Sequence, residues 1–139
     1  MKANELRIGN IVKSNKGSFV IVKEINEGSF NGTVRVVDTT HYDDEVLFGY
    51  SCSEIEPIKL TPEIFLKCGF KQIGVCEFGY SYRLKLNSRM EFAWYPGEEI
   101  LRVQTTSSGS TTSLRHIEAL HQFQNLFFAY TGDELTITL

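Results

Sequence analysis

Two histidines near the C-terminal end of the chain could hold a metal ion or transfer a proton. His116 and His121 are five residues apart in a segment that we expect to be helical, so their side chains would point about 140° apart around the helix axis. Two residues that bind one metal from a single helix are usually three or four positions apart. We therefore predict structural roles for both histidines and no metal site in this segment.

The three cysteines and a short acidic run are further candidates for metal binding. Cys52, Cys68 and Cys76 are far apart, with no CxxC motif and no cluster of histidines beside them, which argues against a structural zinc site. We expect them to be small buried residues of a protein in a reducing compartment. The run Asp43–Glu45, beside Tyr42, lacks the spacing of a calcium-binding EF-hand loop, so we interpret it as a solvated loop.

No pattern in the chain predicts a catalytic or cofactor-binding residue. The segment 105–113 is rich in serine and threonine, but no lysine follows its glycine as a P-loop requires, and no GxSxG nucleophile motif occurs. Gln124 lies among apolar residues of the predicted C-terminal helix. We interpret it as a link to the backbone, because an unpaired buried amide costs about 1–3 kcal/mol; the alternative is a polar anchor in a pocket. We expect no cofactor and no metal.

Two surfaces are candidates for binding. Arg83, Lys85 and Arg102 should share the outward face of a β-meander, with Arg89 near its edge; they could meet a phosphate backbone or an acidic protein, and a solvated sheet face is the alternative. The second surface is aromatic and lies around the acidic run, at Tyr42, Phe48 and Tyr50. Exposed rings of this kind can bind peptides or nucleic acids.

The first 60 residues have the pattern of short strands. Apolar and β-branched residues gather at 6–13, 19–25, 33–37, 46–50 and 55–60, and turn signals such as Asn15–Gly17 separate them. Five short strands favour a small SH3-like β-barrel or a curled antiparallel sheet. The opening LRIGNIV is also similar to the first strand of SH3-like barrels.

A short helix should follow, because both of its ends have local signals. Thr61 can cap it, Pro62 suits the first helical position, and Gly69 suits a left-handed stop. Phe70 should then fold back onto Phe65.

The rest of the chain predicts a meander and a long helix. Strands are expected at 80–86, 90–95 and 100–105, with Pro96–Gly97 as a type II turn. A helix over Leu114–Tyr130 has apolar residues around about two thirds of its circumference, so we expect it to be buried on more than one side. A last strand is expected at Leu135–Leu139. The fold class is therefore α+β, with units 1–60 and 61–139 packed together as one compact body.

Composition and charge limit the classes of protein. The chain has 139 residues, of which 42% are hydrophobic, enough for a core. It has 14 basic and 17 acidic residues, whereas duplex-binding proteins usually have a basic excess, so nucleic acid is disfavoured as a partner. No apolar run approaches the roughly 20 residues that span a bilayer, and no signal peptide opens the chain. We expect a cytoplasmic protein with no membrane partner.

Three blocks of the sequence together resemble a known family. They are KANELRIGNIV at 2–12, IEPIKLTPEIFLKCGF at 55–70 and HQFQNLFFAYTGDELTI at 121–137. The chain resembles small uncharacterised proteins of Bacteroidetes genomes and of phage or other mobile elements, whose blocks read LRxGNxV, PIPLTEExLxxxGF and HxLQNLYFALTGEEL. Two residues depart from that pattern: Lys59 stands where proline is common, and Phe123 stands where leucine is common. The resemblance implies a prophage or mobile-element setting and brings no activity.

Three hypotheses for the function follow. The first is a non-enzymatic binding or adaptor protein of a mobile element, whose partner is another protein or a second copy of the chain. The second is a nucleic-acid-binding accessory protein that uses the basic sheet face. The third is a cryptic enzyme, which would need a pocket where groups such as His116, Gln124 and a cysteine converge.

Overall fold

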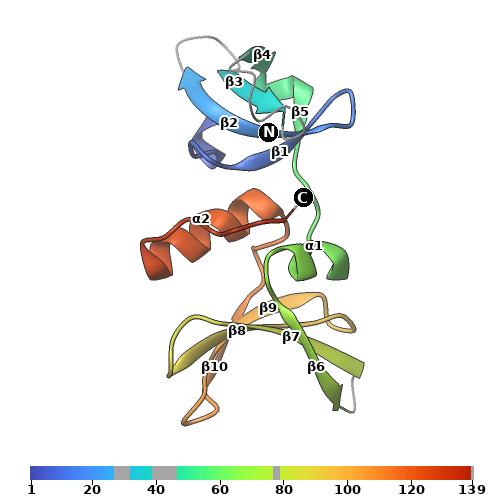
Figure 1. The fold of residues 1–139 in the computed structure, drawn as a ribbon, viewed down its shortest axis with the longest axis vertical. Helices are drawn as coiled ribbons and strands as arrows, with labels where there is room; N and C mark the ends of the chain where they lie inside the picture. The colour runs from blue at the N-terminus through green and yellow to red at the C-terminus, as the bar shows by residue number, and fades with distance from the viewer. Residues whose placement is uncertain (27–31, 39–46, 77–78, 139) are drawn as a thin grey trace. The chain divides into compact units, whose positions relative to one another are not determined.

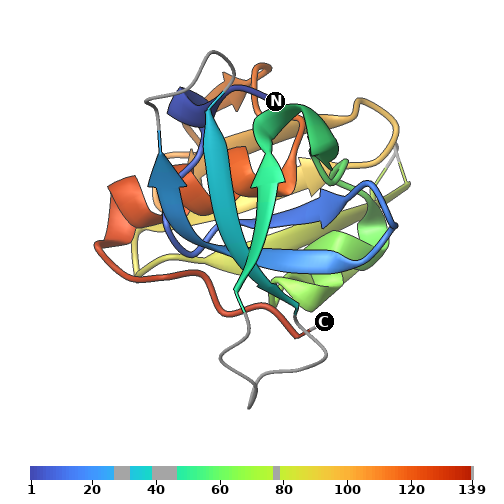
Figure 2. The same cartoon turned by 90° about the horizontal axis from the view of Figure 1, so that it is seen from above.

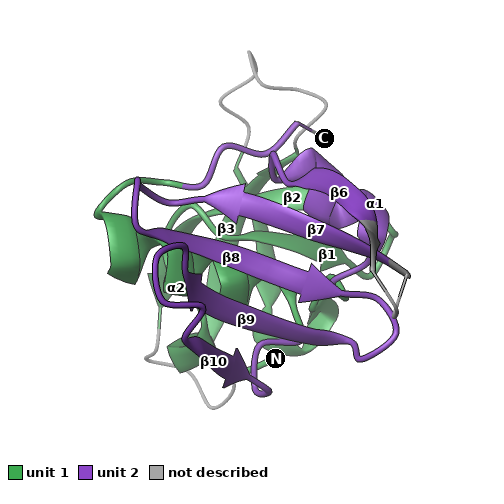
Figure 3. Cartoon of the chain, turned by 90° about the horizontal axis from the view of Figure 1, so that it is seen from below, with its two compact units in different colours: residues 1–59, 119–134 green, residues 60–118, 135–139 purple. Residues whose placement is uncertain are grey.

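The structure is a computed structural model that describes residues 1–26, 32–38, 47–76 and 79–138. The contacts divide the chain into two units, which Figure 3 shows in two colours. Unit 1 consists of Met1–Lys59 and Ala119–Glu134, and unit 2 of Leu60–Glu118 and Leu135–Leu139. The boundary after Lys59 is close to the one expected from the sequence, but the long C-terminal helix groups with the N-terminal unit.

Unit 1 contains a five-stranded antiparallel sheet in the order β4-β3-β2-β1-β5. Figure 1 labels its elements, and Figure 2 shows how its strands twist relative to one another. No pairing between β4 and β5 closes the sheet in the part of the chain that is described. The expected SH3-like barrel is thus an open, curled sheet. Its elements are 3₁₀ turns η1 (Ala3–Glu5) and η2 (Cys52–Glu54) and strands β1 (Ile11–Ser14), β2 (Phe19–Asn26), β3 (Thr33–Asp38), β4 (Phe48–Ser51) and β5 (Ile55–Glu56).

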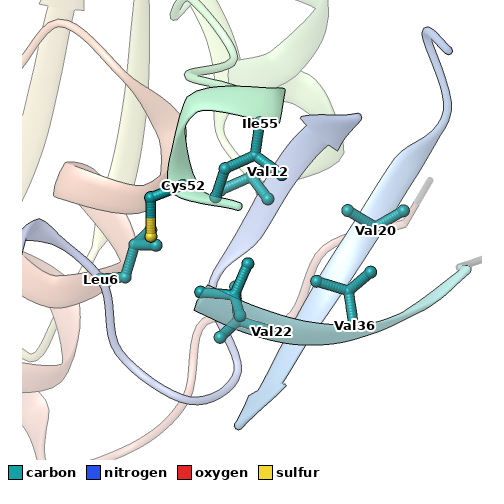
Figure 4. Close-up of a cluster of buried hydrophobic side chains, with 8 residues drawn as sticks. Leu6, Val12, Val20, Val22, Val36, Cys52 and Ile55 are labelled. Atoms are coloured by element: carbon teal, nitrogen blue, oxygen red, sulfur yellow. The ribbon is translucent and has the colours of Figure 1, made fainter. Parts of the chain in front are cut away.

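The core of unit 1 is formed by alternating residues of these strands. Val20 and Val22 of β2 and Val34 and Val36 of β3 are buried, while their neighbours on β3 are exposed or half-buried. This period of two is what a strand with one face on the core requires. Figure 4 shows these side chains gathered on the inner side of the strands; the cluster comprises Leu6, Val12, Val20, Val22, Val34, Val36, Cys52 and Ile55.

The C-terminal helix is shorter than predicted. Helix α2 spans Leu120–Thr131 and ends, as expected, at Gly132, whose φ of 77° is left-handed. Its predicted first residues, 114–119, were wrong: Leu114 ends strand β10 (Thr111–Leu114), and residues 115–119 form a turn and an isolated bridge. His116 therefore lies outside the helix and is exposed. The last strand expected at 135–139 was also wrong: the described residues 134–138 form no strand, although Thr138 N–H donates to the Lys67 carbonyl at 3.0 Å.

Helix α1 (Pro62–Lys67) of unit 2 confirms the predicted start and stop. Thr61 Oγ1 accepts from Ile64 N–H, and Gly69 has a φ of 84°. The N–H of Gly69 donates to the Leu66 carbonyl and that of Phe70 to the Phe65 carbonyl, both at 3.0 Å. This is the Schellman pattern, and it brings the Phe65 and Phe70 rings to 4.7 Å between centroids.

Unit 2 contains a second five-stranded antiparallel sheet, in the order β10-β9-β8-β7-β6. The predicted meander supplies its three central strands, β7 (Gly79–Lys85), β8 (Met90–Tyr95) and β9 (Ile100–Thr105). The edge strands β6 (Lys71–Cys76) and β10 were not predicted. The predicted type II turn at Pro96–Gly97 was wrong, because the left-handed residue is Glu99, with φ of 51°, at the end of a four-residue hairpin loop.

Helix α1 packs on one face of this second sheet. The Phe65 ring lies 4.7 Å from the Trp94 ring, and Tyr82 lies 5.6 Å from Trp94, between centroids. Successive residues of a strand point to opposite faces. Residues that alternate with Tyr82 and Trp94 therefore lie on the face opposite α1, which Figure 3 views directly.

Candidate anion-binding surface

The face of the second sheet opposite α1 carries an unbroken row of paired residues across all five strands. Lys71 pairs with Arg83, Arg83 with Ala93, and Ala93 with Arg102, which pairs with Ser113. Directly opposed residues of neighbouring strands point to the same side. We call this side the cationic face; its cations are Lys71, Arg83, Lys85 and Arg102.

A buried carboxylate fixes one of the two arginines. Glu91 of β8 is only 6% exposed. Its Oε1 accepts from Arg83 Nη1 at 3.0 Å and also from Gln104 Nε2, which lies opposite it on β9. A buried carboxylate needs such partners to stay charged. Glu91 thus orients the Arg83 guanidinium while cancelling part of its charge.

The second arginine is held at the neighbouring hairpin loop. Arg102 Nη2 donates to Glu98 Oε2, and the guanidinium carbon lies 5.2 Å from the centre of the Tyr95 ring. Arginine over a tyrosine face gains cation–π attraction. Both arginine side chains remain partly accessible, at 33% for Arg83 and 27% for Arg102.

Part of the hydrogen-bonding capacity of the two arginines is unused. The Nε atoms of Arg83 and Arg102 are buried and have no partner among the described residues. Lys71 and Lys85 are exposed and form no ion pair with any residue that the structure describes. The strands of this face therefore carry four cations and one acid, Glu91, and four of these five side chains come from the predicted meander.

The sequence placed three of these cations correctly on one face. The period of two in β7 and β9 was sufficient for Arg83, Lys85 and Arg102. Arg89 lies in the exposed β7–β8 loop. Sequence reasoning missed Lys71, because β6 was not predicted, and the acidic partners, because they depend on strand register.

The predicted aromatic surface is described only in part. Tyr42 and the acidic run lie outside the described residues. Phe48 is 48% exposed, and Tyr50 is half-buried and packs against the core of unit 1. Both belong to β4, where they pair with Val36 and Val34 and so share the core side of the sheet. They belong to a different unit from the cationic face.

Gln124 is a backbone link, as the sequence suggested. It is 2% exposed; its Oε1 accepts from Ile11 N–H at 2.8 Å, and its Nε2 donates to the Gly9 carbonyl at 3.2 Å. Beside it, Asn10 Nδ2 donates to Asn125 Oδ1 at 2.9 Å across 115 positions of sequence. We call Asn10, Gln124 and Asn125 the polar lock; it joins α2 to the start of β1.

His121 lies in the same helix and is buried. It is 2% exposed, although its place in the predicted helix was at the edge of the polar side. Neither ring nitrogen has a hydrogen-bond partner among the described residues. Burial lowers the pKa of the His121 imidazole, the Glu5 carboxylate opposes that shift, and the N-terminal ammonium adds to it. Burial in unit 1 therefore favours the neutral form of the ring.

The two described cysteine side chains are buried thiols. Burial raises the pKa of Cys52, against the effect of the N-terminal ammonium, and it raises the pKa of Cys68 to about 12. A thiol with so high a pKa is a poor nucleophile at neutral pH. No group of three or more His, Cys, Asp or Glu side chains in the described ranges could hold a metal ion. Within the same ranges, none of the helices has the length and apolar character to cross a membrane.

Comparison with known proteins provides no relative. No protein-family model, curated protein or solved structure matches the chain. The resemblance to mobile-element proteins thus stays a prediction, and the geometry of the two units carries the functional argument.

Proposed function

We propose that this chain is a non-enzymatic binding protein that docks an anionic partner on the cationic face of unit 2. The row from Lys71 to Ser113, which crosses all five strands of the sheet, carries this proposal. A row of this kind offers Lys71, Arg83 and Arg102 together to an extended chain, whereas isolated surface cations offer one contact each. The mobile-element setting implied by the resemblance is part of the same proposal.

The chemistry of the buried groups supports binding over catalysis. The Cys68 thiol has its pKa raised by burial, and the His121 ring is buried without a described partner. General acid–base and nucleophilic catalysis need groups that reach a substrate and titrate near the working pH. Lys71, Arg83, Lys85 and Arg102, by contrast, reach solvent from one sheet face, which suits docking.

Fluorescence anisotropy tests the proposal with two labelled probes at low salt. One probe is a single-stranded oligonucleotide of about 16 nucleotides, and the other is a glutamate-rich peptide. We expect one of them to bind in the micromolar range and to be released as the salt concentration rises. If neither binds at low salt, the proposal is wrong.

A charge-matched pair of variants locates the binding surface. The triple variant Arg83→Gln, Lys85→Gln, Arg102→Gln removes three cations from the cationic face. The control Lys13→Gln, Lys16→Gln, Lys23→Gln removes the same charge from unit 1. We expect the first variant to lose binding by tenfold or more, about 1.4 kcal/mol, and the control to lose little. Equal losses would show that only net charge matters.

A second candidate surface is the edge strand β4, which favours a protein partner. β4 is an outer strand of its sheet, and Phe48 on it is 48% exposed. Exposed edges can pair with a strand of another chain. Light scattering of the wild type and of Phe48→Ser tests this surface. A wild-type dimer that Phe48→Ser converts to a monomer supports it, whereas a monomer in both cases excludes pairing between two copies through β4.

A further inference from the structure

We propose that unit 2 binds an acidic, extended peptide as an added strand alongside β6, with Lys71 and Ile73 as its side-chain contacts. This inference rests on the proposed function and deepens it, because it names the class of the anionic partner and the way in which it is held. β6 is an outer strand of the second sheet, and its Lys71 begins the row of the cationic face. Addition of a strand to an exposed sheet edge is a common mode of peptide recognition.

The outer edge of β6 is open in the part of the chain that the structure describes. Residues 71–74 are all exposed. A Cβ added at Gly74 would meet no described atom within 4 Å. On its outer side, β6 pairs with no strand formed by described residues. An edge of this kind presents backbone donors and acceptors that a further strand can use.

The outward backbone groups of this edge are those of Gln72. The Ile73 carbonyl accepts from Ser81 Oγ of β7 at 3.1 Å, so it is turned towards β7. Facing residues of an antiparallel pair alternate between hydrogen-bonded and non-hydrogen-bonded positions. The N–H and C=O of Gln72, which faces Tyr82, therefore point away from β7. One residue of a partner strand can accept from Gln72 and donate to it at the same time.

Exposed apolar side chains distinguish β6 from the other edge of the sheet. Ile73 is 46% exposed and Tyr80, on the neighbouring β7, is 52% exposed. Ile73 pairs with Ser81, which alternates with Arg83, so Ile73 lies on the cationic face. The exposed residues of the opposite edge strand, β10, are the polar residues 111–113. A strand added to β6 would cover apolar surface, whereas one added to β10 would not.

The charge of this edge favours an acidic partner. Strands β6 and β7 contain Lys71, Arg83 and Lys85 and no aspartate or glutamate. A residue opposite Lys71 on an added strand would have its Cβ about 4.5–5.5 Å away, where opposite charges attract and like charges repel. A second copy of the chain would bring the same cations to the edge. The edge therefore suits an acidic peptide better than another copy of β6.

A bulge limits the length of the added strand. The register of β6 against β7 shifts between Ile73 and Val75, and Gly74 has a φ of 41°. Bulges twist an edge and shorten the stretch that is available for regular pairing. We therefore expect a short ladder, centred on Gln72, with an affinity in the micromolar range.

A designed peptide of about eight residues tests the inference on the full-length protein. Every second residue is threonine, and the positions between alternate between glutamate and valine, so that glutamate can lie opposite Lys71 and valine opposite Ile73. One control peptide has lysine in place of glutamate, and two others carry N-methyl groups on alternate residues, at odd or at even positions. We expect the parent peptide to bind, and the lysine version and one N-methylated version to bind at least tenfold more weakly. Hydrogen exchange should show protection of the Gln72 amide in the complex, with the β10 amides unchanged.

Variants of the protein separate the backbone contact from the side-chain contacts. Gln72→Pro removes the outward N–H without removing a hydrogen bond to β7, and we expect it to weaken binding at least tenfold; Gln72→Thr keeps the N–H and should bind as the wild type does. Lys71→Gln and Ile73→Thr should each weaken binding about threefold. The matched controls in unit 1 are Lys23→Gln and Ile8→Thr, at exposed positions, and they should have little effect.

The outcomes distinguish strand addition from the broader proposal. If both N-methylated peptides bind as tightly as the parent, or the Gln72 amide stays unprotected in the complex, strand addition is wrong while docking on the cationic face stands. If the oligonucleotide binds and the acidic peptides do not, this inference is wrong and the proposed function stands with nucleic acid as the partner.

Two further results bear on the inference. A wild-type dimer by light scattering, with the Gln72 amide already protected, would show that a second copy occupies the edge and would overturn the acidic peptide as its partner. Trp94 fluorescence during thermal unfolding shows whether unit 2 of each variant still folds. If Gln72→Pro does not fold, the N-methylated peptides and the exchange of the Gln72 amide decide.

Discussion

Replacing Gln124 with leucine should destabilise unit 1 by an amount that the structure allows us to work out. The substitution keeps the side-chain volume nearly constant, so it opens no cavity. It leaves the Ile11 N–H, which is buried and bonded at 2.8 Å, without its acceptor, at about 1–3 kcal/mol. It also removes the 3.2 Å bond to the Gly9 carbonyl, worth about 0.5–1.5 kcal/mol. We expect a total loss of about 1.5–4.5 kcal/mol.

Urea unfolding followed by circular dichroism measures this free energy, and hydrogen exchange localises it. The Ile11 amide should exchange faster in Gln124→Leu, while the amides of β8 in unit 2 keep their protection. Gln72→Leu is the matched control, because the same change at an exposed position should stay within about 0.5 kcal/mol. If Gln124→Leu stays within that margin and Ile11 remains protected, the bonds of the polar lock do not hold α2 to β1.

Three further predictions concern charge and backbone conformation. Because the pKa of His121 is lowered in the folded protein, the unfolded chain binds a proton at this ring more tightly. The contribution of His121 to the free energy of unfolding should therefore be complete above about pH 6.5. It should be lost as the pH drops towards the folded-state pKa. Thermal unfolding of His121→Leu should show a weaker fall in stability between about pH 7 and pH 5 than the wild type shows; an equal fall would contradict this role of His121. Gly69→Ala should lower the free energy of unfolding by about 1–2 kcal/mol, because alanine is strained at a φ of 84°. Gly49→Ala should be neutral, because an added Cβ would meet open space there. Urea unfolding compares the two variants. Glu98→Gln should tighten oligonucleotide binding in the anisotropy assay by about threefold, since it removes the negative charge that Arg102 pairs with; weaker binding would show that the Glu98 contact positions Arg102 for binding and does not compete with the ligand.

Local signals predicted the elements whose ends lie close together in sequence. Helix α1 has a cap, a proline and a stopping glycine within nine residues, 61–69, and all three act as expected. Strand β10 was missed because Thr111–Ser113 has the composition of a loop and becomes a strand only by pairing with β9. Strand β6 was missed because Gly74 interrupts its alternation, where the register shifts between Ile73 and Val75.

The same distinction applies to the candidate site. Periodicity within one strand predicts which side chains share a face, so Arg83, Lys85 and Arg102 could be grouped from the sequence. Which carboxylate meets which arginine depends on the register of one strand against the next and on the conformation of the loop that carries Glu98. Neither is encoded in the spacing of the charged residues, so the pairing of Arg83 with Glu91 and of Arg102 with Glu98 was visible only in the structure.

The position of the polar lock bears on where function should be sought. Its residues lie in the opening and closing blocks that carry the resemblance, 2–12 and 121–137, while the middle block, 55–70, contains the caps of α1. Each block thus has a structural reason for its residues: side-chain amides that satisfy the backbone, or a helix start and stop. The cationic face lies in 71–113, outside all three blocks. Substitutions on a surface that is separate from the helix caps and from the polar lock leave those structural contacts intact, so the residues that carry the resemblance need not be the ones that bind a partner.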